Sequence, residues 1–163
     1  MELTFDIRGH LIPHNRIEVS LDQFEEIFVS LFDTDSTRTH IFQEYLRFLK
    51  DFKEEITENF THWIDGSFVT TTKNPRDIDF VTLIHHVDYE QKRELIDHKY
   101  RLKQAKEDYG VDAYTVEVFS KEHEKHLICR SDLLYWDEWF RKTKRNRAKR
   151  SFPKGYIEIK FGN

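Results

Sequence analysis

The chain has 163 residues, of which 34% are charged and 15% aromatic, and its formal net charge is −4 at pH 7. This length can bury a real core, so we expect one domain, residues 1–163. The only cysteine, Cys129, excludes an intramolecular disulfide and a cysteine-based zinc cluster. No apolar run reaches the length of a membrane span, and residues 1–10 lack the features of a signal peptide, so we expect a cytoplasmic protein with no membrane partner.

The first part of the chain predicts an extended lead-in and two helices. Residues 1–19 are expected to be extended, because Pro13 opposes a helix there. Ser20 begins the sequence SLDQ, a capping box that predicts a helix start. Apolar residues then recur at helical spacing: Leu21, Phe24, Ile27, Phe28, Leu31 and Phe32. After a polar turn, a second amphipathic helix is expected over residues 40–58, and both apolar faces are predicted to form core.

Residues 63–84, WIDGSFVTTTKNPRDIDFVTLI, carry the pattern on which a functional hypothesis depends. Two β-like runs, WID and IDFVTLI, flank a turn at Gly66 and Ser67 and a polar loop. Asp77 and Asp79 are two residues apart, so a strand would place both carboxylates on the same face. Paired carboxylates suit Mg²⁺ or Mn²⁺, since hard cations bind one or two carboxylates together with water and substrate phosphates.

The same loop offers groups that bind phosphate. Gly66 lets the backbone approach a phosphate closely, and Ser67 adds an amide and a hydroxyl donor. Lys73 and Arg76 supply cations for phosphate oxygens. The segment therefore predicts a site where a metal ion could neutralise the charge of a triphosphate and activate an attacking hydroxyl. The alternative is a plain β-hairpin whose glycine and Pro75 form turns and whose aspartates are solvated.

A long, highly charged helix is expected over residues 89–109, with a capping pattern at Asp88 and a C-cap at Gly110. Before it, His85 and His86 are adjacent. Neighbours in an extended segment point to opposite faces, so we expect an exposed pair rather than a metal site.

Residues 111–119, VDAYTVEVF, are rich in β-branched and aromatic residues and predict a strand. Asp112 and Glu117 are five residues apart, so they face opposite sides of a regular strand. Only one of the two can join the aspartates of the preceding strand.

Residues 120–142 are expected to be helical, with a break near Ser131 and Asp132. Trp136 and Trp139 lie on an apolar face of this segment and are expected to be core rather than a base-stacking surface. The alternating sequence YIEIKF, residues 156–161, predicts a half-buried or edge strand.

Residues 141–150, RKTKRNRAKR, contain seven basic residues and no acidic ones, whereas the rest of the chain has 19 basic and 30 acidic residues. Such a run is typical of a nucleic-acid contact. It is equally typical of a solvated loop that balances an acidic body, and the run has no interleaved aromatic residues for base stacking. Both interpretations stay open.

The ordered combination of a hydrophobic strand, Gly-Ser, nine residues and Asp-x-Asp in a second strand resembles the nucleotidyltransferase fold. That superfamily includes DNA polymerase β, kanamycin nucleotidyltransferase and the minimal nucleotidyltransferases of toxin–antitoxin pairs. The longer form, DGSFVT followed by Asp-x-Asp, is similar to a group of small bacterial and phage proteins of that superfamily. This closer similarity extends to the segments LDQFEEIFV and KGYIEIKF.

The resemblance implies an α/β (α+β) fold, a small mixed sheet flanked by four or five helices. The catalytic core would occupy residues 61–119, between an N-terminal part, residues 1–60, and a C-terminal part, residues 120–163. The implied activity is metal-dependent transfer of an NMP from ATP or another NTP to a hydroxyl acceptor. The acceptor would be a tRNA or RNA end, a partner protein or a small molecule, with toxin–antitoxin or phage-defence systems as the setting.

By the same resemblance, Asp77, Asp79 and Asp112 are the expected catalytic residues and metal ligands. Glu117 is held in reserve as the third carboxylate, and a site with only two carboxylates is a further option. If the third carboxylate is missing, the chain is instead a degenerate, non-catalytic module that binds a nucleotide, RNA or a partner protein.

Overall fold

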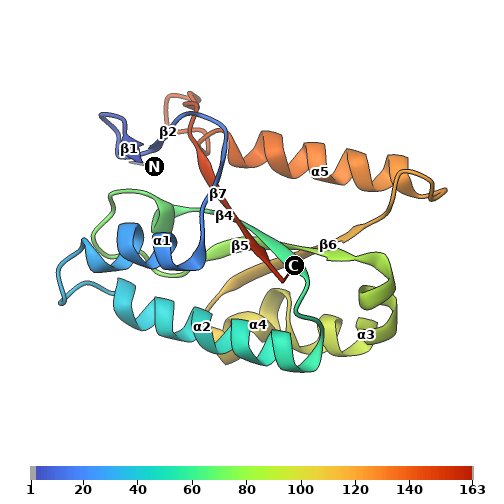
Figure 1. Cartoon of the computed structure of the whole chain (residues 1–163). Coiled ribbons are helices and arrows are strands. Elements are labelled where there is room, and N and C mark those ends of the chain that lie inside the picture. Colours follow the sequence, from blue (N-terminus) through green and yellow to red (C-terminus); the bar gives the residue numbers. More distant parts are fainter. Residues whose placement is uncertain (1–2, 163) are drawn as a thin grey trace.

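Seven strands form two sheets in the part of the chain that the computed structural model describes, residues 3–162. They are β1 (Thr4–Phe5), β2 (Leu11–Ile12), β3 (Arg16–Glu18), β4 (Phe60–Asp65), β5 (Asp79–His85), β6 (Asp112–Val118) and β7 (Tyr156–Phe161). β1 and β2 form a short hairpin, and the other five strands form a mixed sheet in the order β3-β7-β4-β5-β6 (Figure 1). β4 is antiparallel to both of its neighbours, whereas the β3–β7 and β5–β6 pairs are parallel.

Helices cover both faces of the five-stranded sheet (Figure 1). One face carries α1 (Leu21–Glu25), the π-helical segment η1 (Glu26–Ser30), α2 (Arg38–Glu55), α3 (His86–Lys99) and α4 (Leu102–Tyr109), and the opposite face carries α5 (His126–Phe140). A 3₁₀ turn, η2 (Ser67–Val69), follows β4. The predicted class, a small mixed sheet flanked by four or five helices, is confirmed. Within residues 3–162 no helix has both the length and the apolar composition needed to cross a membrane.

The larger hydrophobic core lies between the sheet and α1, α2, α3 and α4, and it is rich in aromatic rings. Tyr45 and Phe48 of α2 pack on Phe80 of β5, with ring centroids 5.6 and 5.1 Å apart. The prediction that the first two amphipathic helices supply core residues is therefore confirmed. A second, smaller cluster lies under α5 and contains Trp63, Val81, Val116, Phe140 and Tyr156.

The first helix begins as the sequence predicts. The Ser20 hydroxyl accepts a hydrogen bond from the Gln23 amide, and the Gln23 side chain accepts one from the Ser20 amide. Beyond Glu25 the chain widens into η1, which breaks the spacing of 3.6 residues per turn. Leu31 follows this segment and is 75% exposed, so its expected place in the core was wrong.

The helix expected over residues 89–109 is two helices, α3 and α4. α3 starts earlier than predicted, at His86, because the His85 side chain rather than Asp88 caps it, by accepting a hydrogen bond from the Val87 amide. The break falls at Tyr100, which is buried and whose hydroxyl donates to the Glu55 carboxylate on α2. This tertiary contact accompanies the break in a helix that the local sequence predicts to be continuous. The C-cap at Gly110 is confirmed, with left-handed φ of 66°.

Two expectations for the C-terminal part were wrong. α5 runs without a break at Ser131, because the residues that face the sheet, Cys129, Leu133, Trp136 and Phe140, keep one continuous helical stripe. β7 is a mostly buried inner strand rather than a half-buried or edge strand, because β3 pairs with it in parallel on the side away from β4.

Candidate functional site

Three adjacent strands each contribute one aspartate at the same level of the sheet. Asp65 ends β4, Asp79 begins β5 and Asp112 begins β6. Asp79 is the pairing partner of Asp65 on one side and of Asp112 on the other. Paired residues of neighbouring strands project from the same face, and strands lie about 4.8 Å apart, so these residues form a row of three carboxylates. The three are called the aspartate row below.

A fourth carboxylate stands beside this row. Asp77 lies two residues before β5, and its Oδ2 accepts a hydrogen bond from the Lys106 ammonium of α4. Asp77 and Asp79 both line one cleft, so their side chains lie on the same side of the sheet. Strand β5, however, begins only at Asp79 and does not include Asp77.

Mutual repulsion and burial shape the charge of the aspartate row. The pKa of Asp79 is raised to about 7, first by burial, then by the charge of Asp77, by a hydrogen bond with Asp112 and by the charges of Asp112 and Asp65. The pKa of Asp65 is raised by burial as well, while the Lys154 ammonium opposes that rise. Lys154 comes from the segment just before β7, is 8% exposed and forms an ion pair with Asp65.

Gly66 links the aspartate row to the loop that follows it. Its φ of 80° and ψ of −167° belong to a region that only glycine occupies readily. A Cβ at this position would overlap the Asp79 carboxylate. Ser67, the next residue, lines the cleft, and its Oγ makes no hydrogen bond to any residue from 3 to 162. The turn therefore presents a free hydroxyl next to the carboxylates, and the Gly66 amide donates a hydrogen bond to the Asp65 carboxylate.

The loop after Gly66 is held by a buried cation, Arg38 of α2. The Arg38 guanidinium donates five hydrogen bonds to four backbone carbonyls, which belong to Phe28, Phe68, Thr70 and Thr72. Three of those carbonyls belong to the loop, so the position of the Gly66–Ser67 turn depends on this side chain.

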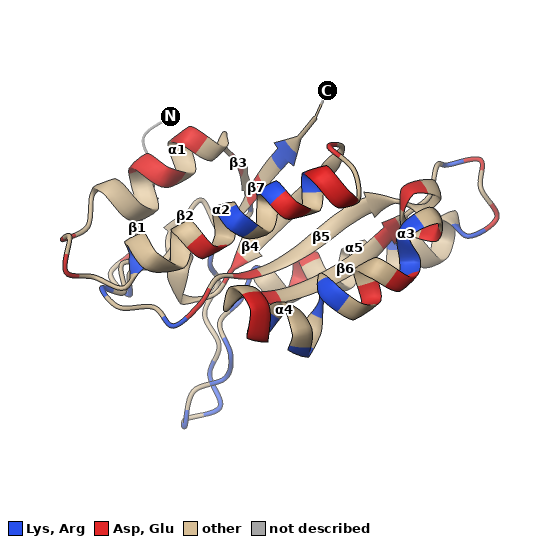
Figure 2. Ribbon diagram, turned by 90° about the horizontal axis from the view of Figure 1, so that it is seen from below, with Lys and Arg blue, Asp and Glu red and all other residues tan. Residues whose placement is uncertain are grey.

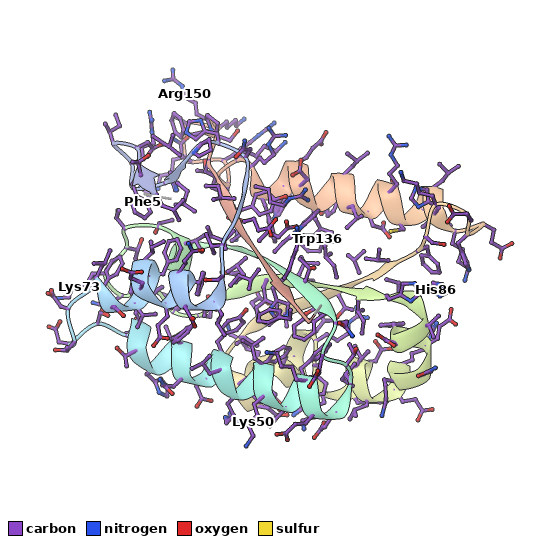
Figure 3. All side chains as sticks on the ribbon, viewed as in Figure 1. Phe5, Lys50, Lys73, His86, Trp136 and Arg150 are labelled. Carbon is purple, nitrogen blue, oxygen red and sulfur yellow. The ribbon has the colours of Figure 1, made fainter. Side chains whose placement is uncertain are left out.

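These groups open into one cleft with a volume of about 1290 Å³. Its floor carries the aspartate row, and Gly66 and Ser67 lie at its edge. The opposite wall comes from α5 and the segment that follows it. The residues of that wall include aromatic and basic side chains: Tyr135, Trp136, Trp139, Lys142, Lys144 and Arg145. Figure 3 shows Trp136 on the side of α5 that faces the sheet.

The structure brings together most of the residues that the sequence singled out. Gly66, Ser67, Asp77, Asp79 and Asp112 all line the cleft. Of the two candidates for a third carboxylate, Asp112 is therefore the one at the site. The reserve residue, Glu117, lies 3.9 Å from the guanidinium of Arg93 on α3, away from the aspartate row.

Lys73 and Arg76 do not line the cleft, contrary to their expected role with phosphate. The Lys73 ammonium is bound to Asp33 and Asp35, at 3.2 and 3.1 Å, in the turn between η1 and α2. Arg76 is exposed. The cations that do line the cleft come from elsewhere in the chain, among them Lys154, which carries no sequence signal.

The donor set of the cleft suits a hard divalent cation. Asp79 and Asp112 are close enough to share a hydrogen bond, and Mg²⁺ typically takes only one or two carboxylates together with water and substrate phosphates. Across residues 3–162, no three His, Cys, Asp or Glu side chains stand ready to hold a metal ion together. A site of this kind would therefore use Asp79 with Asp112 or Asp77, and a bound nucleotide would supply further oxygen ligands.

Comparison with known proteins gives one match. The model of a family of unknown function, DUF6932, matches residues 3–160. No curated protein and no solved structure matches the chain.

Proposed function

The chain belongs to the DUF6932 family, and we propose that it is a metal-dependent nucleotidyltransferase that moves an NMP from ATP or another NTP to a hydroxyl acceptor. The observation that carries the proposal is the arrangement of Asp79 and Asp112. They are paired across neighbouring strands, and the Gly66–Ser67 turn lies at the same end of the sheet. This arrangement agrees with the resemblance of the DGSFVT and Asp-x-Asp motifs to nucleotidyltransferases.

Each part of the cleft has a role in this reaction. The Ser67 hydroxyl holds the triphosphate, because no group among residues 3–162 competes for it, and Gly66 lets a phosphate approach the turn closely. Asp79, together with Asp112 or Asp77, would hold the metal ion and through it the phosphates. Bound Mg²⁺ or Mn²⁺ supplies neutralisation of the phosphate charge. The work of the protein is mostly placement and charge balance, as in phosphoryl transfer generally.

The chemical step forms a bond between the acceptor oxygen and the α-phosphorus of the NTP. The bond from that phosphorus to the oxygen bridging to the β-phosphate breaks, and pyrophosphate leaves. The acceptor proton passes to a carboxylate of the aspartate row. The acceptor is an RNA end, such as that of tRNA, or a hydroxyl of a partner protein, in a toxin–antitoxin or phage-defence setting that follows from the resemblance alone.

The test is transfer of label from each α-³²P-labelled NTP with Mg²⁺ or Mn²⁺, using total RNA and cell lysate as acceptors. We expect labelled RNA or protein with the wild type, and at least about a 100-fold loss with Asp79→Asn, a change that removes charge at the centre of the row. Asp22→Asn removes one exposed carboxylate on α1 and serves as the matched control. No label with any NTP and either metal ion would refute the proposal.

A second candidate function is supported by the two lysines of the site. Lys106 and Lys154 already bind Asp77 and Asp65, and among the described residues no three His, Cys, Asp or Glu side chains are placed to hold a metal together. This favours a non-catalytic module that binds a nucleotide, RNA or a protein without turnover. Such a module would bind its ligand equally well with Asp79→Asn, and it would transfer no label.

A further inference from the structure

The wall of the cleft opposite the aspartate row is formed by α5, and it carries two aromatic rings that are largely open to solvent. Tyr135 is 60% exposed and Trp139 is 48% exposed, and their ring planes are within 10° of parallel. By contrast, Trp136 packs with Tyr114 and Phe140 over the sheet. The expectation that both tryptophans belong to the core therefore holds for Trp136, which is partly buried, and is wrong for Trp139.

Directly after these rings the basic run, residues 141–150, folds back as a hairpin. Lys142 pairs with Pro153, and the Thr143 amide donates to the Phe152 carbonyl at 2.8 Å. Figure 2 shows the segment as a largely blue loop that extends from the body of the molecule. Six basic residues of the run are exposed and form no ion pair within residues 3–162: Lys142, Lys144, Arg145, Arg147, Lys149 and Arg150. Their charges are available to an anionic ligand.

We propose that this wall binds single-stranded nucleic acid, with bases stacked on Tyr135 and Trp139 and phosphates bound by Lys142, Lys144 and Arg145. Proteins that bind single strands combine a positive groove with aromatic rings for the bases. Here the rings come from α5 and the cations from the hairpin, and both line the cleft that holds the aspartate row. The basic run contains no aromatic residue of its own, but the fold places the rings of Tyr135 and Trp139 beside it.

The size of the cleft and the position of the wall support the strand as the acceptor, an inference that rests on the proposed function. The cleft volume, about 1290 Å³, exceeds the roughly 300–1000 Å³ that is usual for one small ligand. It therefore has room for a nucleotide at the carboxylates and for the end of a strand beside it. A terminal hydroxyl of the strand would then face the α-phosphate.

The test is fluorescence anisotropy of labelled 12-nucleotide oligouridine RNA, the matching DNA strand, and a 12-base-pair RNA duplex, without NTP or divalent metal. We expect the single strands to bind more tightly than the duplex, with an affinity that falls as KCl rises from about 50 to 200 mM. The RNA and DNA arms show which sugar is preferred.

Two variants separate the contributions of charge and stacking. The triple change Lys142→Gln, Lys144→Gln, Arg145→Gln should weaken binding at least about tenfold and reduce the slope of log K against log salt by about 2, since each phosphate contact to a single strand contributes about 0.7. The double change Tyr135→Ala, Trp139→Ala should weaken binding about tenfold or more at every salt concentration.

Matched controls use side chains away from the cleft. Lys50→Gln, Lys92→Gln, Lys103→Gln removes the same charge from exposed positions on α2, α3 and α4, and Figure 3 shows Lys50 and Arg150 on opposite sides of the molecule. Leu127→Ala, Leu134→Ala removes exposed apolar groups of α5, which are 73% and 57% exposed. Both controls should leave strand binding unchanged within about twofold.

The outcomes separate this inference from the proposed function. Equal binding by the wild type and the cleft variants, or a duplex that binds as tightly as a single strand, would overturn it. Label transferred only to a lysate protein, with loss in Leu127→Ala, Leu134→Ala, would also overturn it while leaving the transferase intact. Strand binding that depends on the cleft residues, with no label from any NTP, would support the binding wall and refute the transferase.

Discussion

Arg38 is the residue whose replacement tests most directly how the fold positions the candidate site. Its guanidinium is fully buried and makes no ion pair with any carboxylate among residues 3–162. Instead it donates to the carbonyls of Phe28, Phe68, Thr70 and Thr72, and its carbon lies 3.7 Å from the centroid of the Phe32 ring. Burial lowers the pKa of Arg38 to about 10, so the group remains charged at neutral pH.

The expected cost of Arg38→Met follows from these contacts. Five hydrogen bonds of about 1 kcal/mol net each sum to about 5 kcal/mol. Methionine also removes the cost of burying a charge, so we expect the free energy of unfolding to fall by about 3 kcal/mol. A domain is stable by about 5–15 kcal/mol, so the variant should fold, with a Tm lower by about 6–12 °C.

The measurement is urea unfolding followed by circular dichroism, together with hydrogen exchange of the loop amides. Arg38→Met should speed exchange in residues 67–72 more than elsewhere, because it releases the carbonyls that hold the loop. Arg93→Met is the matched control, since Arg93 is 55% exposed and its ion pair is long, so the loss should be within about 1 kcal/mol. A loss below about 1 kcal/mol for Arg38→Met, or unchanged exchange in the loop, would refute this account of the loop.

Two further predictions concern the backbone conformation of Gly66 and the buried side chain of His62. Gly66→Ala should abolish label transfer and lower the free energy of unfolding by about 1–3 kcal/mol, because φ of Gly66 is 80° and the Asp79 side chain occupies the space of a Cβ. The control is Gly110→Ala, whose Cβ would meet nothing within 4 Å and which should keep label transfer. Activity in Gly66→Ala would contradict the role assigned to the turn. Burial, and then the charge of Lys53, lower the pKa of His62 well below 6.5, so below pH 6.5 the unfolded chain binds a proton that the native state does not. As the pH is lowered below 6.5, the free energy of unfolding should therefore decrease, by up to about 1.4 kcal/mol per pH unit from this residue. Urea unfolding at several pH values should show a smaller dependence of the free energy of unfolding on pH for His62→Gln, but not for the exposed His98→Gln.

Local signals in the sequence predicted much of the fold. The capping box at Ser20 and the glycine C-cap at Gly110 act within a few residues, and both are where the pattern places them. The errors have a tertiary origin. The bond from Tyr100 to Glu55 divides one predicted helix into two, and strand β3 makes an inner strand of residues that alternate like an edge. Neither partner can be identified from the neighbouring sequence.

The candidate site shows the same division between local and distant information. The spacing of Asp77 and Asp79 and the turn at Gly66 indicated one part of the cleft. Asp65 was missed, although it directly precedes the turn. The antiparallel pairing of its strand with β5 would have placed it opposite Asp79 once the register was known. Lys154 is 89 residues from Asp65 in sequence, and only the position of β7 beside β4 brings the two together.

The charge balance of the cleft gives a physical reason for the metal in the proposed function. Asp65, Asp77, Asp79 and Asp112 together carry four negative charges when ionised, and Lys106 binds Asp77 while Lys154 binds Asp65. Asp79 and Asp112 then remain without a protein cation, side by side and partly buried, where like charges repel strongly. One divalent cation would supply the two positive charges that the lysines leave unmatched. Since the lysines neutralise only Asp65 and Asp77, Asp79 and Asp112 are left to hold the metal that binds the phosphates of a nucleotide.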